Sequence, residues 1–170
     1  NKIDDESFTI KKFLNNKKEL LEHKYVINYL VNILSRYTNK ISFDKKPKIL
    51  ALEHLYHLHT PIKGNFIKKI HVLDLLNELY PTPAVLGIPI NQAREVIIDY
   101  EPFDRGWYSG CIGWFDLDGN GRFDVSIRSA LQVKNTLFCY AGSGIINESI
   151  ENNEWEETES KFQHLLSLIK

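Results

Sequence analysis

The spacing of apolar residues along the chain predicts a mixture of helices and strands. Between residues 15 and 37, Val26, Leu30, Ile33 and Leu34 recur at helical spacing and indicate one long amphipathic helix. The same patterns predict further helices over 71–80, 91–100 and 151–169, and strands over 49–60, 107–116, 123–133 and 136–141. This order predicts an α+β fold, in which antiparallel strands pack with helices.

Prolines, glycines and short polar runs predict where these elements end. Pro81-Thr82-Pro83-Ala84 is expected to be a rigid loop, because each proline fixes φ and moves its predecessor away from helix. Asn91 is a candidate N-cap for the helix that follows. Asp118-Gly119-Asn120-Gly121 and Lys134-Asn135 predict turns that join the last three strands into a meander. Residues 1–13 carry no such pattern and are expected to be irregular.

A charged stripe opens the last predicted helix. Glu154, Glu157 and Lys161 share one helical face, and that face continues into Leu165 and Leu168. An amphipathic helix turns such a stripe inward, where charges are costly unless they are paired or bound to a metal. This face is therefore expected to meet a cation, an anionic ligand or both. The alternative is an exposed salt bridge between Glu157 and Lys161, which are four residues apart.

Another acidic residue on an apolar helical face lies in the first predicted helix. Glu22 precedes Val26 by four residues and shares its apolar face. Glu22, Glu154 and Glu157 offer only oxygen ligands, and a small all-oxygen set suits Mg²⁺, which completes its shell with water and an anionic substrate. For either helix taken alone, the spacing favours surface salt bridging over a metal site.

Two further features suit an anionic ligand. Arg128 lies in an otherwise apolar predicted strand, where alternation places it on one face with Ser126 and Ala130. It is either a solvent-facing arginine or a fork that clamps a carboxylate. Gly142-Ser143-Gly144 follows a predicted strand, and glycines let backbone N–H groups approach an anion closely. The alternative for this segment is an ordinary turn.

Two possible metal motifs fail on spacing. His54, His57 and His59 lie close together, but no further ligand stands at a typical distance, so a single histidine that acts on a ligand or packs in the core is favoured. The run from Asp116 to Gly121 imitates the start of a calcium loop. Its twelfth position is Ile127 rather than the required glutamate, which favours a plain turn.

Composition excludes some classes of function. The 170 residues are 43% hydrophobic and 25% charged, with a net charge of −1, so there is no basic footprint for nucleic acid. No apolar run reaches the length of a membrane span. Cys111 and Cys139 lie in apolar stretches and are expected to be buried free thiols in a reducing, cytoplasmic compartment, with a disulfide as the alternative.

Seven short motifs follow one another between Leu14 and the C-terminus. They are Lys18–His23, His57–Gly64, Pro81–Pro89, Glu101–Gly110, Ile127–Arg128, Ala141–Ile145 and Glu154–Lys161. In this order the chain resembles the chorismate-utilising enzymes, a family of anthranilate, aminodeoxychorismate, isochorismate and salicylate synthases. Each motif alone is weak, whereas the set is specific.

Within that family the chain most resembles the isochorismate synthases of menaquinone and siderophore biosynthesis. The Pro81-Thr82-Pro83-Ala84 loop is similar to theirs, and so is the run Glu101–Tyr108. Tyr80 departs from the pattern, because the family often has histidine there, and this change is expected to alter loop packing. The resemblance implies a cytoplasmic isomerase that converts chorismate to isochorismate, with water adding at C2 and the C4 hydroxyl leaving.

The resemblance also implies roles for individual residues. Magnesium would be held by Glu22, Glu154 and Glu157. Substrate-binding residues would be Ala84 and Val85 around the ring, and Tyr108, Arg128, Lys161 and the backbone of Gly142, Ser143 and Gly144 around the enolpyruvyl carboxylate. His57 would be the catalytic residue of this chain, as a group that polarises C4 or handles its proton.

The family places its lysine base and glutamate acid in an N-terminal half that no segment here resembles. Residues 14–170 are therefore expected to be the C-terminal part of a single chorismate-binding catalytic domain. Alone, the chain is expected to lack meaningful turnover and to self-associate through unpartnered sheet edges and apolar surface. Two alternatives stay open: a salicylate, anthranilate or aminodeoxychorismate synthase, and a non-catalytic module that binds Mg²⁺ or a dicarboxylate.

Overall fold

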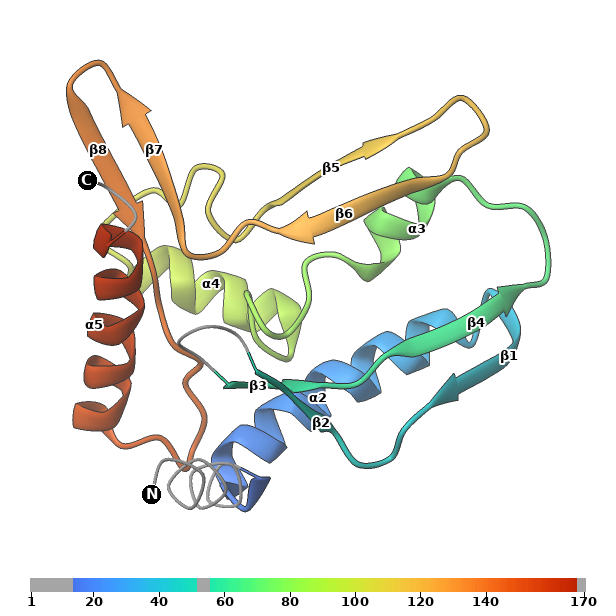
Figure 1. Cartoon of the computed structure of the whole chain (residues 1–170), viewed down its shortest axis with the longest axis horizontal. Coiled ribbons are helices and arrows are strands. Elements are labelled where there is room, and N and C mark those ends of the chain that lie inside the picture. Colours follow the sequence, from blue (N-terminus) through green and yellow to red (C-terminus); the bar gives the residue numbers. More distant parts are fainter. Residues whose placement is uncertain (1–13, 52–55, 168–170) are drawn as a thin grey trace. The chain divides into compact units, whose positions relative to one another are not determined.

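The computed structural model describes residues 14–51 and 56–167, which form two compact units (Figure 1). The first unit ends at Ile70 and the second begins at His71. The predicted irregular segment 1–13 lies outside the described residues. Helices alternate with antiparallel strand pairs, so the predicted α+β class is confirmed.

The first unit contains one long helix, α2, which spans Lys17–Leu34 and confirms the predicted helix. Asn16 caps it, because its side chain accepts hydrogen bonds from the backbone N–H groups of Lys18 at 3.0 Å and Glu19 at 3.4 Å. The apolar face packs inward, and Ile33 is 6% exposed. The helical spacing therefore identified the buried face correctly.

Two antiparallel strand pairs follow α2 among the described residues of the first unit. Strand β1 (Thr38–Phe43) pairs with β4 (Ile62–Phe66), and β2 (Lys48–Ala51) pairs with β3 (Tyr56–His59). The single strand predicted over 49–60 was wrong, because its two ends are strands that pair with each other. Strands β1 and β4 were not predicted, since their lysines, asparagines and glycine dilute the apolar alternation on which such predictions rest.

In the described part of the second unit, three helices lie near the predicted places. They are α3 (Val72–Leu79), α4 (Ile90–Tyr100) and α5 (Glu151–Ser167). The predicted cap at Asn91 was wrong. Pro89 occupies the cap of α4 with extended backbone angles, and Asn91 already lies inside the first turn.

Two hairpins follow α4 along the chain and precede α5 (Figure 1). Strand β5 (Cys111–Phe115) pairs with β6 (Gly121–Val125), and β7 (Ser129–Val133) pairs with β8 (Thr136–Tyr140). Both predicted turns are confirmed. In the first turn, Asp116 Oδ1 accepts hydrogen bonds from the backbone N–H groups of residues 118 and 120, each at 2.9 Å, so the carboxylate stabilises a plain turn.

The strand predicted over 123–133 was wrong, because the chain breaks between β6 and β7. Ser126 exchanges hydrogen bonds of 2.8 Å with the backbone of Ser109 and Gly110, and Arg128 has a φ of 47°. A positive φ cannot continue a strand. Among the described strands, β6 and β7 therefore belong to separate hairpins rather than to a three-stranded meander.

The described residues bury little apolar surface. The buried apolar side chains are Ile33 and Leu165, while Trp107, Trp114 and Ile112 are 85%, 60% and 71% exposed. Isolated two-stranded sheets with exposed aromatic residues support the expectation of self-association, which stays a prediction.

Both cysteines are free, but Cys111 is exposed and Cys139 is half-buried, so the prediction of buried thiols was wrong.

None of the described helices combines the length and apolar character that membrane crossing requires.

Candidate functional site

The charged stripe of α5 faces inward as predicted. Glu154 is only 6% exposed and Leu165 only 7%, while Glu157 and Lys161 are half-buried. Leu168 lies outside the described residues. A buried carboxylate on the first turns of this helix is costly unless a partner or a cation compensates it. The stripe is therefore the natural starting point for a polar site.

Lys161 ties α5 to the loop that follows β8. Its Nζ donates to the carbonyl oxygen of Gly142 at 2.8 Å and to Glu157 Oε1 at 2.5 Å. The ion pair four residues apart was foreseen as the alternative to a ligand site, and it exists. Unlike an ion pair confined to the helix surface, Lys161 also bonds to Gly142, and this bond holds the ammonium against the small-residue loop.

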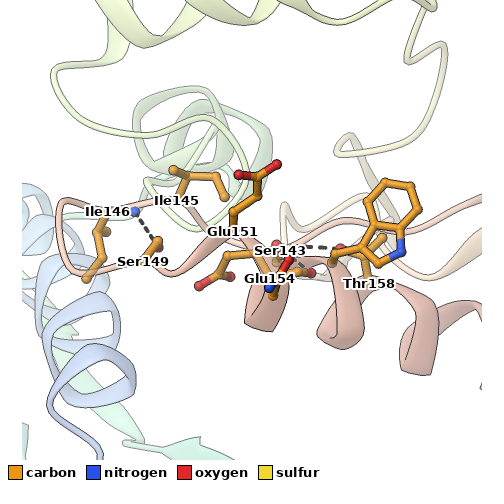
Figure 2. A pocket seen from close by; sticks show the side chains of 9 residues that line it. Ser143, Ile145, Ile146, Ser149, Glu151, Glu154 and Thr158 are labelled. Atoms are coloured by element: carbon orange, nitrogen blue, oxygen red, sulfur yellow. Dashed lines mark hydrogen bonds between the residues drawn. The ribbon is translucent and has the colours of Figure 1, made fainter.

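Ser143 makes a second link between the same two segments. Its Oγ donates to the backbone carbonyl of Glu154 at 3.4 Å and accepts a long contact from Thr158 Oγ1 at 3.5 Å (Figure 2). The loop and the start of α5 line an open depression of about 650 Å³, to which Ile145 and Trp155 contribute apolar walls. A strand followed by an irregular small-residue loop was predicted here and is confirmed.

Tyr108 reaches the same loop from the segment before β5. Its ring stacks on that of Tyr140, with centroids 5.5 Å apart and an interplanar angle of 18°. A Cβ placed on Gly142 would lie 3.0 Å from the Tyr108 hydroxyl, so the two residues are in close contact. Burial raises the pKa of Tyr108, which keeps the hydroxyl protonated and able to donate at neutral pH.

Three predicted substrate-binding residues thus converge. The Lys161 ammonium and the Tyr108 hydroxyl both lie against Gly142. An ammonium carries three donors, of which two are used by Gly142 and Glu157, so the third can serve an anion. Together, these contacts bring a cationic donor and a hydroxyl donor to the Gly142 loop.

Arg128 lies in the link between β6 and β7 rather than in a strand. Its backbone has a positive φ, so it does not share a strand face with Ser126 and Ala130, and that part of the prediction was wrong. The residue is half-buried rather than fully solvent-facing. Its role as a carboxylate clamp stays a prediction.

Ala84 and Val85 lie in the tight turn between α3 and α4, where backbone N–H groups of Val85 and Leu86 donate to Thr82 at 3.1 and 3.2 Å. Ala84 is exposed and Val85 half-buried. Arg105, which the sequence analysis did not single out, donates to the Val85 carbonyl at 2.7 Å. Its position four residues after Glu101 is the one sequence signal that could have indicated it.

The first unit carries the two remaining candidates. Glu22 is half-buried in α2, with Oε1 3.2 Å from Lys18 Nζ. His57 lies half-buried in β3, opposite Leu50 of β2. His54 lies outside the described residues.

A neighbouring histidine in the first unit makes a side-chain hydrogen bond. His23 Nε2 lies 2.8 Å from Thr60 Oγ1. Burial, followed by the nearby His59, lowers the pKa of His23, which therefore stays neutral near pH 7. Sequence analysis did not identify this pair, because its partners are 37 residues apart.

The predicted magnesium ligands are divided between the two units. Glu154 and Glu157 lie one helical turn apart on α5, and Glu22 belongs to the first unit. Within the part of the chain that the structure describes, no three histidine, cysteine or acidic side chains are gathered as a metal site. The magnesium site stays a prediction.

Comparison with known proteins decides the family. The sequence profile of the chorismate binding enzymes matches residues 1–170. The chain belongs to the chorismate binding enzyme family. It is 37% identical to isochorismate synthase MenF of Bacillus subtilis over 156 residues, which cover 92% of this chain and 33% of that protein.

Solved structures of the family share the fold. The menaquinone-specific isochorismate synthase MenF from Escherichia coli matches with a TM-score of 0.85 and 31% identity, over 98% of this chain and 39% of its own. Anthranilate synthase component I from Streptococcus pneumoniae matches with a TM-score of 0.82 and 26% identity, over 95% and 38%. The chain thus spans about a third to two fifths of the length of these relatives.

Proposed function

We propose that this chain is the C-terminal portion of an isochorismate synthase and carries its substrate anchors. The convergence of Lys161 and Tyr108 on Gly142 is the observation that carries the proposal. The greater identity to isochorismate synthases than to the anthranilate synthase of the same fold favours water as the nucleophile.

The donors around Gly142 suit the enolpyruvyl carboxylate of chorismate. The third N–H of Lys161 and the Tyr108 hydroxyl supply two hydrogen bonds, one of them charge-assisted. Backbone N–H groups of the loop up to Gly144 add further donors, and Arg128 adds a guanidinium fork. Such fixed donors orient the substrate before reaction and so remove part of the entropic barrier.

The acidic residues fit magnesium by their chemistry. Glu154 and Glu157 offer carboxylate oxygens one helical turn apart, and such oxygens are the ligands that Mg²⁺ prefers. Glu22 is proposed as a further ligand on the resemblance to the family. Magnesium, when bound, would neutralise the ring carboxylate and lower the cost of adding a nucleophile to a dianion.

Addition of water at C2 and loss of the C4 hydroxyl need a general base and a general acid. We propose that the base and the acid lie in the part of the relatives that this chain does not span. His57 is proposed to polarise the C4 hydroxyl or handle its proton, while Ala84 and Val85 shape the pocket around the ring. The chain alone should then bind substrate groups without converting them.

The product of the full-length polypeptide tests this function. We expect chorismate, Mg²⁺ and ammonium to yield isochorismate, identified by NMR, and the 170-residue chain alone to yield none. Anthranilate, aminodeoxychorismate or salicylate would assign the protein to a sibling activity. Failure to consume chorismate would overturn the proposal in favour of a non-catalytic binding module.

A substitution at Gly142 tests the contact with Tyr108. Gly142→Ala places a methyl group 3.0 Å from the Tyr108 hydroxyl, and the stack on Tyr140 leaves the ring little room to move. We expect the KM for chorismate to rise about fivefold, because crowding displaces one donor by a few tenths of an ångström.

Tyr108→Phe supplies the matched background for this test. Without the hydroxyl, the added methyl group has space, so Gly142→Ala should then change KM little. Equal penalties in both backgrounds would show that the close contact does not matter for binding.

A further inference from the structure

Arg105 occupies the centre of a polar network in the second unit. Its Nε donates to Glu101 Oε2 at 2.7 Å, and its Nη2 donates to the other carboxylate oxygen of Glu101. This is a bidentate pair, in which the planar guanidinium is held in one orientation. The side chain of Arg105 is 23% exposed and that of Glu101 28%, so the pair is partly shielded from solvent.

The same guanidinium reaches two other segments. Nη1 donates to the backbone carbonyl of Val85 at 2.7 Å and to Ser109 Oγ at 3.2 Å. Its Cζ lies 5.8 Å from the centroid of the Tyr108 ring, within reach of a cation–π interaction. One side chain therefore joins the turn between α3 and α4 to the segment that carries Tyr108.

Tyr80 makes a parallel link between the same two segments. Its hydroxyl is directed at the backbone carbonyls of Ser109 and Gly110, the latter at 2.8 Å. Burial raises its pKa to about 12, so the hydroxyl remains a donor over the physiological pH range. The turn is thus anchored at its start by Tyr80 and at Val85 by Arg105.

We infer that Arg105 is a positioning residue, which holds the Val85 turn and the Tyr108 ring so that both present one fixed shape to the substrate. Glu101 holds Arg105 in turn. The inference rests on the proposed function, because that proposal assigns Val85 and Tyr108 to the substrate. Arg105 itself touches neighbouring protein groups and acts through them.

Arg105→Lys tests this role with little risk to the fold. Lysine keeps the charge and one bond to Glu101, but it cannot donate to Glu101, Val85 and Ser109 from a planar fork. In the full-length polypeptide we expect the KM for chorismate to rise about tenfold while kcat changes less than about threefold. Arg122→Lys is the matched control, since Arg122 is 74% exposed on β6, and it should leave both constants unchanged.

A merely structural role gives a different pattern. Loss of folded enzyme lowers apparent kcat and leaves KM unchanged, and that result would overturn the inference. The double variant with Tyr108→Phe adds a second criterion. If Arg105 acts partly through Tyr108, the two KM effects should combine to less than their product, whereas full multiplication would contradict the coupling.

Hydrogen exchange separates this inference from the proposed function. Arg105→Lys should speed exchange at the amides of residues 85–87 and 108–110, and Arg122→Lys should not. If the wild-type protein fails to consume chorismate, the proposed function falls, and exchange alone decides whether Arg105 positions these segments. Unchanged exchange in Arg105→Lys would overturn the positioning role.

Discussion

Replacing Lys161 by methionine is expected to lower kcat/KM for chorismate about 100-fold in the full-length polypeptide. The ammonium holds Gly142 through a bond of 2.8 Å, pairs with Glu157 and keeps one N–H for the ligand. Methionine fills similar space without any of these bonds. Removal of a preorganised cation that faces a carboxylate costs about 3 kcal/mol of transition-state binding.

Steady-state kinetics would measure this loss. Two further variants serve as a control and as a test of charge. Lys24→Met removes a lysine from the exposed face of α2 and should leave kcat/KM unchanged. Lys161→Arg keeps the charge with a different geometry and should recover part of the loss. A folded Lys161→Met protein with wild-type kcat/KM would remove Lys161 from the site.

Glu154→Gln is expected to abolish the response of activity to magnesium at ordinary concentrations. The amide has nearly the shape of the carboxylate, so the buried position is refilled, but the negative charge that would attract the proposed Mg²⁺ is lost. We expect the magnesium concentration for half-maximal rate to rise about 100-fold, the upper end of what the loss of an outer-shell partner causes.

Glu156→Gln is the matched control, because Glu156 is exposed on the same helix two residues away. Titration of Mg²⁺ against rate, and against heat of binding by calorimetry, would compare the two variants. Equal magnesium affinity in Glu154→Gln and wild type would show that the buried carboxylate serves only the fold.

The helices of this protein could be predicted because their signals are local. The apolar face of α2 and the charged stripe of α5 repeat at helical spacing, and each packs as expected, with Ile33 and Glu154 buried. The ion pair between Glu157 and Lys161 follows from the same spacing. These features depend on residues three or four positions apart.

The strands could be predicted only in part, because their limits depend on distant partners. The break before Arg128 depends on two hydrogen bonds, in which Ser126 accepts from the Ser109 N–H and donates to the Gly110 carbonyl, and no local pattern reveals them. Similarly, the apolar run over 49–60 conceals two strands that pair with each other. Alternation indicates extended backbone, but it does not show where the chain turns.

The site, like the fold, could be predicted from local patterns but not where it depends on residues distant in the chain. Motif resemblance indicated Tyr108, Gly142 and Lys161, but their contact is a tertiary fact that only the fold reveals. Arg105 was missed because its partner Val85 lies 20 residues earlier in the chain. Residues that hold a site through backbone carbonyls leave little trace in sequence patterns.

A crystal structure of the full-length polypeptide with Mg²⁺ and chorismate or its product tests the central claim most directly. We predict that the enolpyruvyl carboxylate lies within hydrogen-bond distance of Lys161 Nζ and Tyr108 Oη, beside Gly142. A ligand bound with that carboxylate away from Lys161 and Tyr108 would contradict the account, whatever product the enzyme forms.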